Sequence, residues 1–156
     1  MNHLPMTIAA LTIGSCVMYA PVVSAQGAHT MVVPTELKWA DVPSLPAGAK
    51  IATIEGPLNE AVPFTFRLKF PANYSIPAHW HPAIEHVTVI SGTFHMGTGD
   101  KLDKAAARAL SVGSVAIMQP KTNHFAWAGE ETIVQVHGVG PWAITYVNPS
   151  DDPRKK

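Results

Sequence analysis

The chain has 156 residues and a formal net charge of zero, because 11 Lys and Arg residues balance 11 Asp and Glu residues. The length predicts one globular domain, and the absence of a basic cluster argues against nucleic acid as a partner. The single cysteine, Cys16, excludes an intrachain disulfide and a site built from several thiolates.

The first 25 residues have the pattern of a secretory signal peptide. Residues 6–23 are uncharged and largely apolar, and Val23 and Ala25 are small residues at the positions that a signal peptidase reads. No Lys or Arg precedes the apolar run, so an N-terminal membrane anchor stays open as an alternative, as does a lipoprotein cleavage site at Cys16. We expect cleavage after Ala25, a secreted or periplasmic protein, and no membrane association afterwards.

Residues 50–149 carry short runs of β-forming residues, separated by Gly and Pro. The clearest is residues 64–70, where apolar and polar residues alternate as on a half-buried strand. Many short strands with such punctuation predict a barrel or a sandwich. Residues 26–49, rich in Pro, Ala and Gly, are expected to form an arm on this barrel or on a neighbouring subunit, and residues 150–156 a polar tail. The predicted strands cover residues 50–55, 64–70, 85–91, 93–96, 112–118, 125–127, 132–136 and 143–147.

One segment interrupts the β pattern. Residues 100–110 consist largely of helix-forming residues, and Asp100 could cap their N-terminus. The composition predicts a short helix here, which would serve either as a lid over the barrel mouth or as a surface excursion.

Two histidines and a glutamate lie within the seven residues 79–85, whose sequence is His-Trp-His-Pro-Ala-Ile-Glu. On a strand, side chains at positions i and i+2 point to one face, so His79 and His81 would aim at the same point. Glu85 keeps this parity. Nitrogen and carboxylate ligands suit a divalent first-row metal, and addition of His124 would leave room for water or a substrate on the ion.

This pattern resembles the first motif of the cupin superfamily. His79-x-His81-x-x-x-Glu85 is followed by Gly92, and the looser second motif consists of Gly113, Pro120 and His124. The resemblance implies an all-β fold, a single jelly-roll-like antiparallel barrel. It also implies one divalent ion, Mn, Fe, Ni, Cu or Zn, with these ligands: His79, His81, Glu85 and His124.

Some residues depart from the cupin pattern. Asn73 stands where a Gly usually opens the first motif, although Asn tolerates a left-handed backbone better than most residues. In the second motif, Thr122 and Ala128 replace the expected Gly and Asn. These departures concern the turns more than the proposed ligands.

His137 lies at the end of a late predicted strand, at residues 132–136. If that strand runs beside the one after His124, His137 could reach the cavity as a general acid or base, or support a metal ligand. The alternative is a histidine that ends a strand and bonds to backbone. Trp142 is expected to pack in the core.

Three classes of function remain open. The first choice is an oxidoreductase of the dioxygenase type, and the second is a non-redox lyase, isomerase or decarboxylase that uses the metal as a Lewis acid. The third is a non-catalytic small-molecule or metal-binding module. In each case the expected partner is a small organic molecule. The resemblance also implies a homodimer or larger homo-oligomer.

Overall fold

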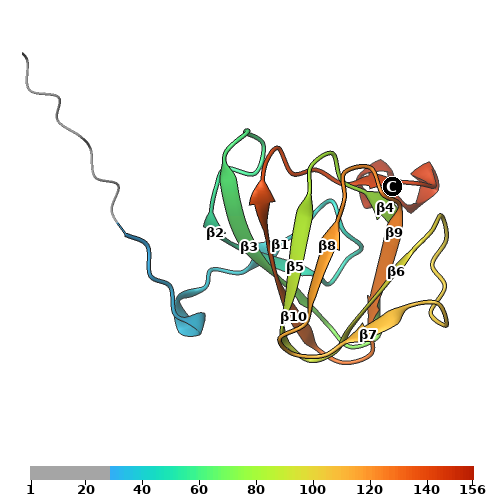
Figure 1. The fold of residues 1–156 in the computed structure, drawn as a ribbon, viewed down its shortest axis with the longest axis horizontal. Helices are drawn as coiled ribbons and strands as arrows, with labels where there is room; N and C mark the ends of the chain where they lie inside the picture. Colours follow the sequence, from blue (N-terminus) through green and yellow to red (C-terminus); the bar gives the residue numbers. More distant parts are fainter. Residues whose placement is uncertain (1–28) are drawn as a thin grey trace, which may run out of the picture. The chain divides into compact units, whose positions relative to one another are not determined.

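The computed structural model describes residues 29–156, so the predicted signal peptide lies outside the described part of the chain. The chain divides by contacts into residues 1–31 and 32–156, and the second unit folds into two antiparallel sheets. The all-β prediction is confirmed. Strand order is β1-β2-β3-β10-β5-β8 in the six-stranded sheet and β11-β4-β9-β6-β7 in the five-stranded sheet (Figure 1).

The strands cover most of the predicted runs and add three, namely β1, β4 and β7. Their bounds are β1 Ala40–Asp41, β2 Lys50–Glu55, β3 Pro63–Phe70, β4 Tyr74–Trp80, β5 Glu85–Ser91, β6 Phe94–Thr98, β7 Arg108–Leu110, β8 Val115–Met118, β9 His124–Ala128, β10 Thr132–Val139 and β11 Thr145–Tyr146. Between residues 29 and 156 the helices are single 3₁₀ turns, η1 Pro34–Glu36, η2 Pro149–Asp151 and η3 Pro153–Lys155. None of the helices in this range is long and apolar enough to cross a membrane.

The alternation in β3 places its aromatic residues in the core. Phe64, Phe66, Leu68 and Phe70 are buried, whereas the intervening residues are partly exposed. Burial of each such side chain stabilises the fold by about 1.5–3 kcal/mol. The residue spacing in β3 therefore decides which face of the six-stranded sheet turns inward.

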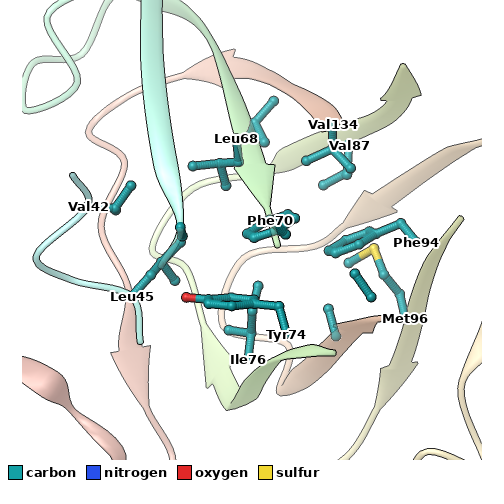
Figure 2. Packing of buried hydrophobic residues seen from close by; sticks show 14 of the residues in the cluster. Val42, Leu45, Leu68, Phe70, Tyr74, Ile76, Val87, Phe94, Met96 and Val134 are labelled. Carbon is teal, nitrogen blue, oxygen red and sulfur yellow. The ribbon is translucent and has the colours of Figure 1, made fainter. Parts of the chain in front are cut away.

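An aromatic stack joins the two sheets. The ring of Phe70 on β3 lies 5.3 Å from that of Phe94 on β6, and 5.2 Å from that of Tyr74 on β4 (Figure 2). Both pairs are nearly parallel, with interplanar angles of 4° and 23°. Because β3 belongs to one sheet and β4 and β6 to the other, this stack fills the space between them.

The segment before β2 packs onto the barrel of its own chain. Strand β1 pairs with β2, and Leu45 is buried in the core. The hydroxyl groups of Tyr74 and Tyr146 donate hydrogen bonds to the carbonyls of Pro46 and Ser44. These contacts fix the second half of the expected arm as a wall of the barrel interior.

The prediction of a helix over residues 100–110 is wrong. The Asp103 carboxylate accepts hydrogen bonds from the backbone of Ala105 and Ala106, which makes a turn, and the chain then enters β7. Strand β7 pairs with β6 and buries Leu110. Ladder bonds and the burial of Leu110 outweigh the helix propensity of the alanines, because propensity is a weak preference.

The turn between β3 and β4 confirms that Asn73 can take the place of the usual Gly. Its φ angle is 63°, in the left-handed region. The other turn of the first motif needs its glycine, because a Cβ at Gly92 would lie 2.6 Å from the carbonyl oxygen of Glu131. Both turns position the strands that carry the candidate ligands.

Candidate metal centre

A β-bulge in β4 turns His79 toward the interior. In the pairing of β4 with β9, Ile76 lies opposite Ala126 and His79 opposite His124, so β4 contains one extra residue. In a regular strand without a bulge, alternation from the buried Ile76 would place His79, three residues later, on the outer face. The bulge therefore brings His79 to the same side as His124.

The three histidines point nitrogen lone pairs toward one another. Each Nδ1 lies within hydrogen-bond distance of a backbone carbonyl: His79 to Pro77 at 2.7 Å, His81 to Ala143 at 2.7 Å, and His124 to Thr122 at 2.9 Å. A neutral imidazole whose Nδ1–H donates to a carbonyl keeps its lone pair on Nε2. One nitrogen from each ring lies within 4.8 Å of the others, so the group could hold a metal ion.

Burial keeps two of these rings neutral. It holds the pKa of His79 well below its usual value, and the neighbouring imidazoles of His124 and His81 lower it further. Burial also lowers the pKa of His124, although the Thr122 carbonyl and Glu85 oppose this shift. Neutral imidazole is the form that binds metals. These two rings can therefore bind a metal at neutral pH without first losing a proton.

Glu85 lies at the start of β5, beside the histidines. Its Oε2 is 3.4 Å from His81 Nε2 and 3.9 Å from His124 Nε2. Its Oε1 accepts a hydrogen bond of 2.9 Å from the indole nitrogen of Trp142. One carboxylate oxygen is therefore held by Trp142, and the other faces the imidazoles.

The donor set fits a divalent metal. His124 Nε2 is buried and has no hydrogen-bond partner, which is costly for a polar atom unless a ligand completes it. Three imidazole nitrogens and one carboxylate oxygen match the preference of first-row divalent ions. These four side chains are His79, His81, Glu85 and His124, the set expected from the sequence.

The centre opens into a cavity between the two sheets. The cavity has about 390 Å³ of empty space, counting the part open to solvent. Apart from Trp142 and the four candidate ligands, its walls are apolar side chains from both sheets and from the segment before β2, among them Leu45, Phe94 and Val136. A small molecule in this space would lie against the metal centre.

Solved structures of low sequence identity share this architecture. The polyketide cyclase RemF from Streptomyces resistomycificus is 16% identical, with a TM-score of 0.66, over 82% of this chain and 92% of the cyclase. A candidate acetylacetone dioxygenase from Methylibium petroleiphilum is 16% identical, with a TM-score of 0.61, over 81% of this chain and 85% of that protein. An RmlC-like cupin from Shewanella frigidimarina is 15% identical, with a TM-score of 0.56, over 70% and 89%.

The chain has the cupin fold. No protein-family model and no curated protein matches its sequence.

The departures from the second cupin motif affect the turn and leave the candidate ligand in place. Lys121 takes the left-handed conformation in this turn, with a φ angle of 60°. The next residue, Thr122, offers its carbonyl to His124 Nδ1. The turn therefore orients His124 through its backbone, so a side chain at position 122 is tolerated.

His137 does not reach the cavity. It lies on β10 opposite His86 of β5, and the two rings stack with centroids 4.9 Å apart and an interplanar angle of 14°. Its neighbour Val136 is buried and lines the cavity. Because side chains alternate along a strand, His137 faces the outer side of the sheet. The structure thus removes the basis for His137 as an acid–base group in the cavity.

Trp142 is the site residue that the sequence reasoning missed. Its ring packs against the core, as expected, but it also stacks on His81 at 5.3 Å and 21° and donates to Glu85. A tryptophan just after a Gly-Pro pair carries little sequence signal of such a role. Only the fold brings residue 142 beside residues 81 and 85.

Proposed function

We propose that this cupin is a metal-dependent enzyme that acts on a small organic molecule inside its barrel, with dioxygenase chemistry as the first choice. The observation that carries the proposal is the convergence of three imidazole nitrogens in the lining of a mostly apolar cavity. His79, His81 and His124 would hold the ion through nitrogen, and Glu85 through Oε2. Mn, Fe, Ni, Cu and Zn all accept such ligands.

A bound Fe, Mn or Cu ion would supply redox chemistry with dioxygen, and any of these ions could polarise a substrate oxygen. The chain's own residues favour the redox alternative. Among the described residues that line the cavity, the only side chains able to move a proton are the candidate ligands themselves. A lyase or isomerase would need a separate acid or base, and His137 lies on the outer face.

Two of the similar structures have names that indicate an activity. One is named as a polyketide cyclase and another as a candidate dioxygenase, and at 16% identity each shares only the fold with this chain. They illustrate both alternatives, redox and non-redox. Non-redox metal chemistry is therefore the second candidate, and a non-catalytic binding module the third.

Metal analysis of protein purified from its native compartment is the first test. We expect about one divalent ion per chain. The protein would then be loaded in turn with Fe, Mn, Cu and Zn, and oxygen uptake measured with small catechols and diketones. Uptake with a redox-active metal and none with Zn supports the proposal. Turnover with Zn supports the non-redox alternative, and a protein without bound metal contradicts both.

We also propose export, since residues 6–25 have the signal-peptide pattern. N-terminal sequencing of protein exported from its own host should begin near Gln26. Recovery of an intact Met1 in the soluble cytoplasm would contradict export.

A further inference from the structure

Among the described residues that line the cavity, no polar side chain other than the candidate metal ligands is free to bind a substrate. The indole N–H of Trp142 is taken by Glu85. The Nδ1 atoms of His79, His81 and His124 are taken by backbone carbonyls. The other lining residues are apolar.

The apolar walls surround the metal centre on both sides. Phe70, Val134 and Val136 come from the six-stranded sheet, and Phe94 and Met96 from the five-stranded sheet. All five are less than one-tenth exposed. A carboxylate, phosphate or sugar hydroxyl placed among them would lose its water without gaining a partner, which is unfavourable.

Resting on the proposed function, we infer the chemical class of the substrate. The site takes a compact, uncharged, predominantly apolar molecule that carries its oxygen donors at one end, directed at the metal. The empty volume of about 390 Å³ is an upper bound, because it includes the part open to solvent, so the body of the molecule must be small. Sugars, sugar acids, phosphate esters and amino acids are excluded.

A matched pair of probes tests this inference on the unmodified full chain. 4-Methylcatechol and 3,4-dihydroxybenzoate present the same two oxygens and differ in one group, a methyl against a carboxylate. Dissociation constants would be measured by calorimetry with the Zn-loaded protein, since Zn does not oxidise catechols. We expect 4-methylcatechol to bind at least about tenfold more tightly, the effect of one unpaired polar group.

Two other effects favour binding of 3,4-dihydroxybenzoate, so tighter binding of 4-methylcatechol would be strong support for an apolar cavity. The carboxylate makes the catechol more acidic and adds negative charge near a cation, and both effects favour 3,4-dihydroxybenzoate. Equal or tighter binding of 3,4-dihydroxybenzoate would overturn the inference while leaving the metal centre intact.

Two variants on β10 test whether 4-methylcatechol binds inside the cavity. Val136→Thr keeps the side-chain shape but adds a hydroxyl to the wall, and Val139→Thr makes the same change on the exposed outer face. Val136→Thr should weaken 4-methylcatechol binding severalfold at unchanged Zn content, and Val139→Thr should not. Equal effects of the two variants would overturn the assignment to this cavity.

A last measurement separates this inference from the proposed function. If the protein holds no metal, the proposed function fails, but the cavity can still be tested with toluene and benzoate by ligand-observed NMR. Binding of toluene and not of benzoate supports the apolar class. Preferential binding of benzoate overturns it.

Discussion

Each ligand histidine has one nitrogen committed to a backbone carbonyl, so its other nitrogen is oriented before a metal arrives. His81→Ala or His124→Ala should therefore weaken metal binding by roughly 100-fold or more, since loss of a residue that only supports a ligand already costs about 10–100-fold. Glu85→Gln keeps the shape and should cost less. Competition with a chromogenic chelator measures each constant.

His137→Ala is the matched control for these variants. It removes an imidazole of the same chain from the outer face, beside His86, and should leave metal affinity and any turnover unchanged. Parent-like affinity in His79→Ala and His81→Ala would refute the ligand assignment. A loss of metal in His137→Ala would show that the outer face contributes to binding.

Trp142 is predicted to position Glu85. Trp142→Phe retains an aromatic ring against His81 and Phe66 but removes the hydrogen bond to Glu85 Oε1. We expect metal affinity to fall by about 10–100-fold with little change in melting temperature. The electron paramagnetic resonance spectrum of the Mn-loaded variant should also change, because the carboxylate is free to reorient. Trp127→Phe, a change on β9 away from the centre, should alter neither property.

At the scale of elements, the bulge in β4 connects local structure with the site. Pro77 has no N–H and cannot donate within the ladder, and the bulge accommodates it in an inner strand. The bulge also presents the Pro77 carbonyl to His79. Deletion of Ala78 should make the pairing of β4 with β9 regular. The Pro77 carbonyl would then no longer lie two residues before His79, where it accepts the hydrogen bond from Nδ1. We expect metal binding to weaken by about tenfold or more.

Pro77→Ala is the control for that deletion, because it keeps the residue count and the carbonyl. It should bind metal like the parent in the same chelator competition. If the Ala78 deletion binds metal as tightly as Pro77→Ala does, the bulge has no role in orienting His79.

The sequence predicted strands where apolar and polar residues alternate, as in β3 and β5. Burial of one face of a strand selects this alternation, so the alternation indicates the strand. It missed β4 as a complete strand, since Pro77 lies inside it and the bulge breaks the alternation. It misread residues 100–110, where pairing with β6 overrides a helical composition. Local patterns cannot encode partners that lie far away in the chain.

In the site, too, the sequence indicated the local spacing but not the long-range contacts. The spacing of His79, His81 and Glu85 is local, and the structure places the three together with His124 as the family motif implied. The position of His137 depends on the register of β10 with β5, and that of Trp142 on the long-range contact that brings it beside Glu85. Neither could be read from spacing.

At the scale of the whole molecule, the outer face of the six-stranded sheet predicts self-association. Val115 and Ile117 on the edge strand β8 are 54% and 51% exposed, and Val139 on β10 is 53% exposed. We expect a homodimer by light scattering, because association would cover these apolar side chains. Ile117→Lys should shift the protein toward the monomer, and Val112→Lys, in the preceding loop, should not. A monomeric full chain would contradict this prediction.

Buried neutral histidines also make the stability of the metal-free protein depend on pH. The folded pKa values of His79 and His124 lie below the unfolded value of about 6.5, so the unfolded chain binds more protons below that pH. Stability is therefore complete above about pH 6.5 and is lost as the pH falls, by up to about 1.4 kcal/mol per pH unit for each histidine.

Urea unfolding of the metal-free protein at about pH 7.5 and about pH 5.5 measures this effect, and the parent protein should be less stable at the lower pH. The double variant His79→Gln/His124→Gln replaces both groups by side chains that do not titrate, so its stability should change less between the two pH values. Saturation with Zn at the higher pH should increase the difference for the parent protein, because metal binds only the neutral rings of the folded state. Equal pH dependence in the parent and the double variant would show that these rings do not control the acid sensitivity of the fold.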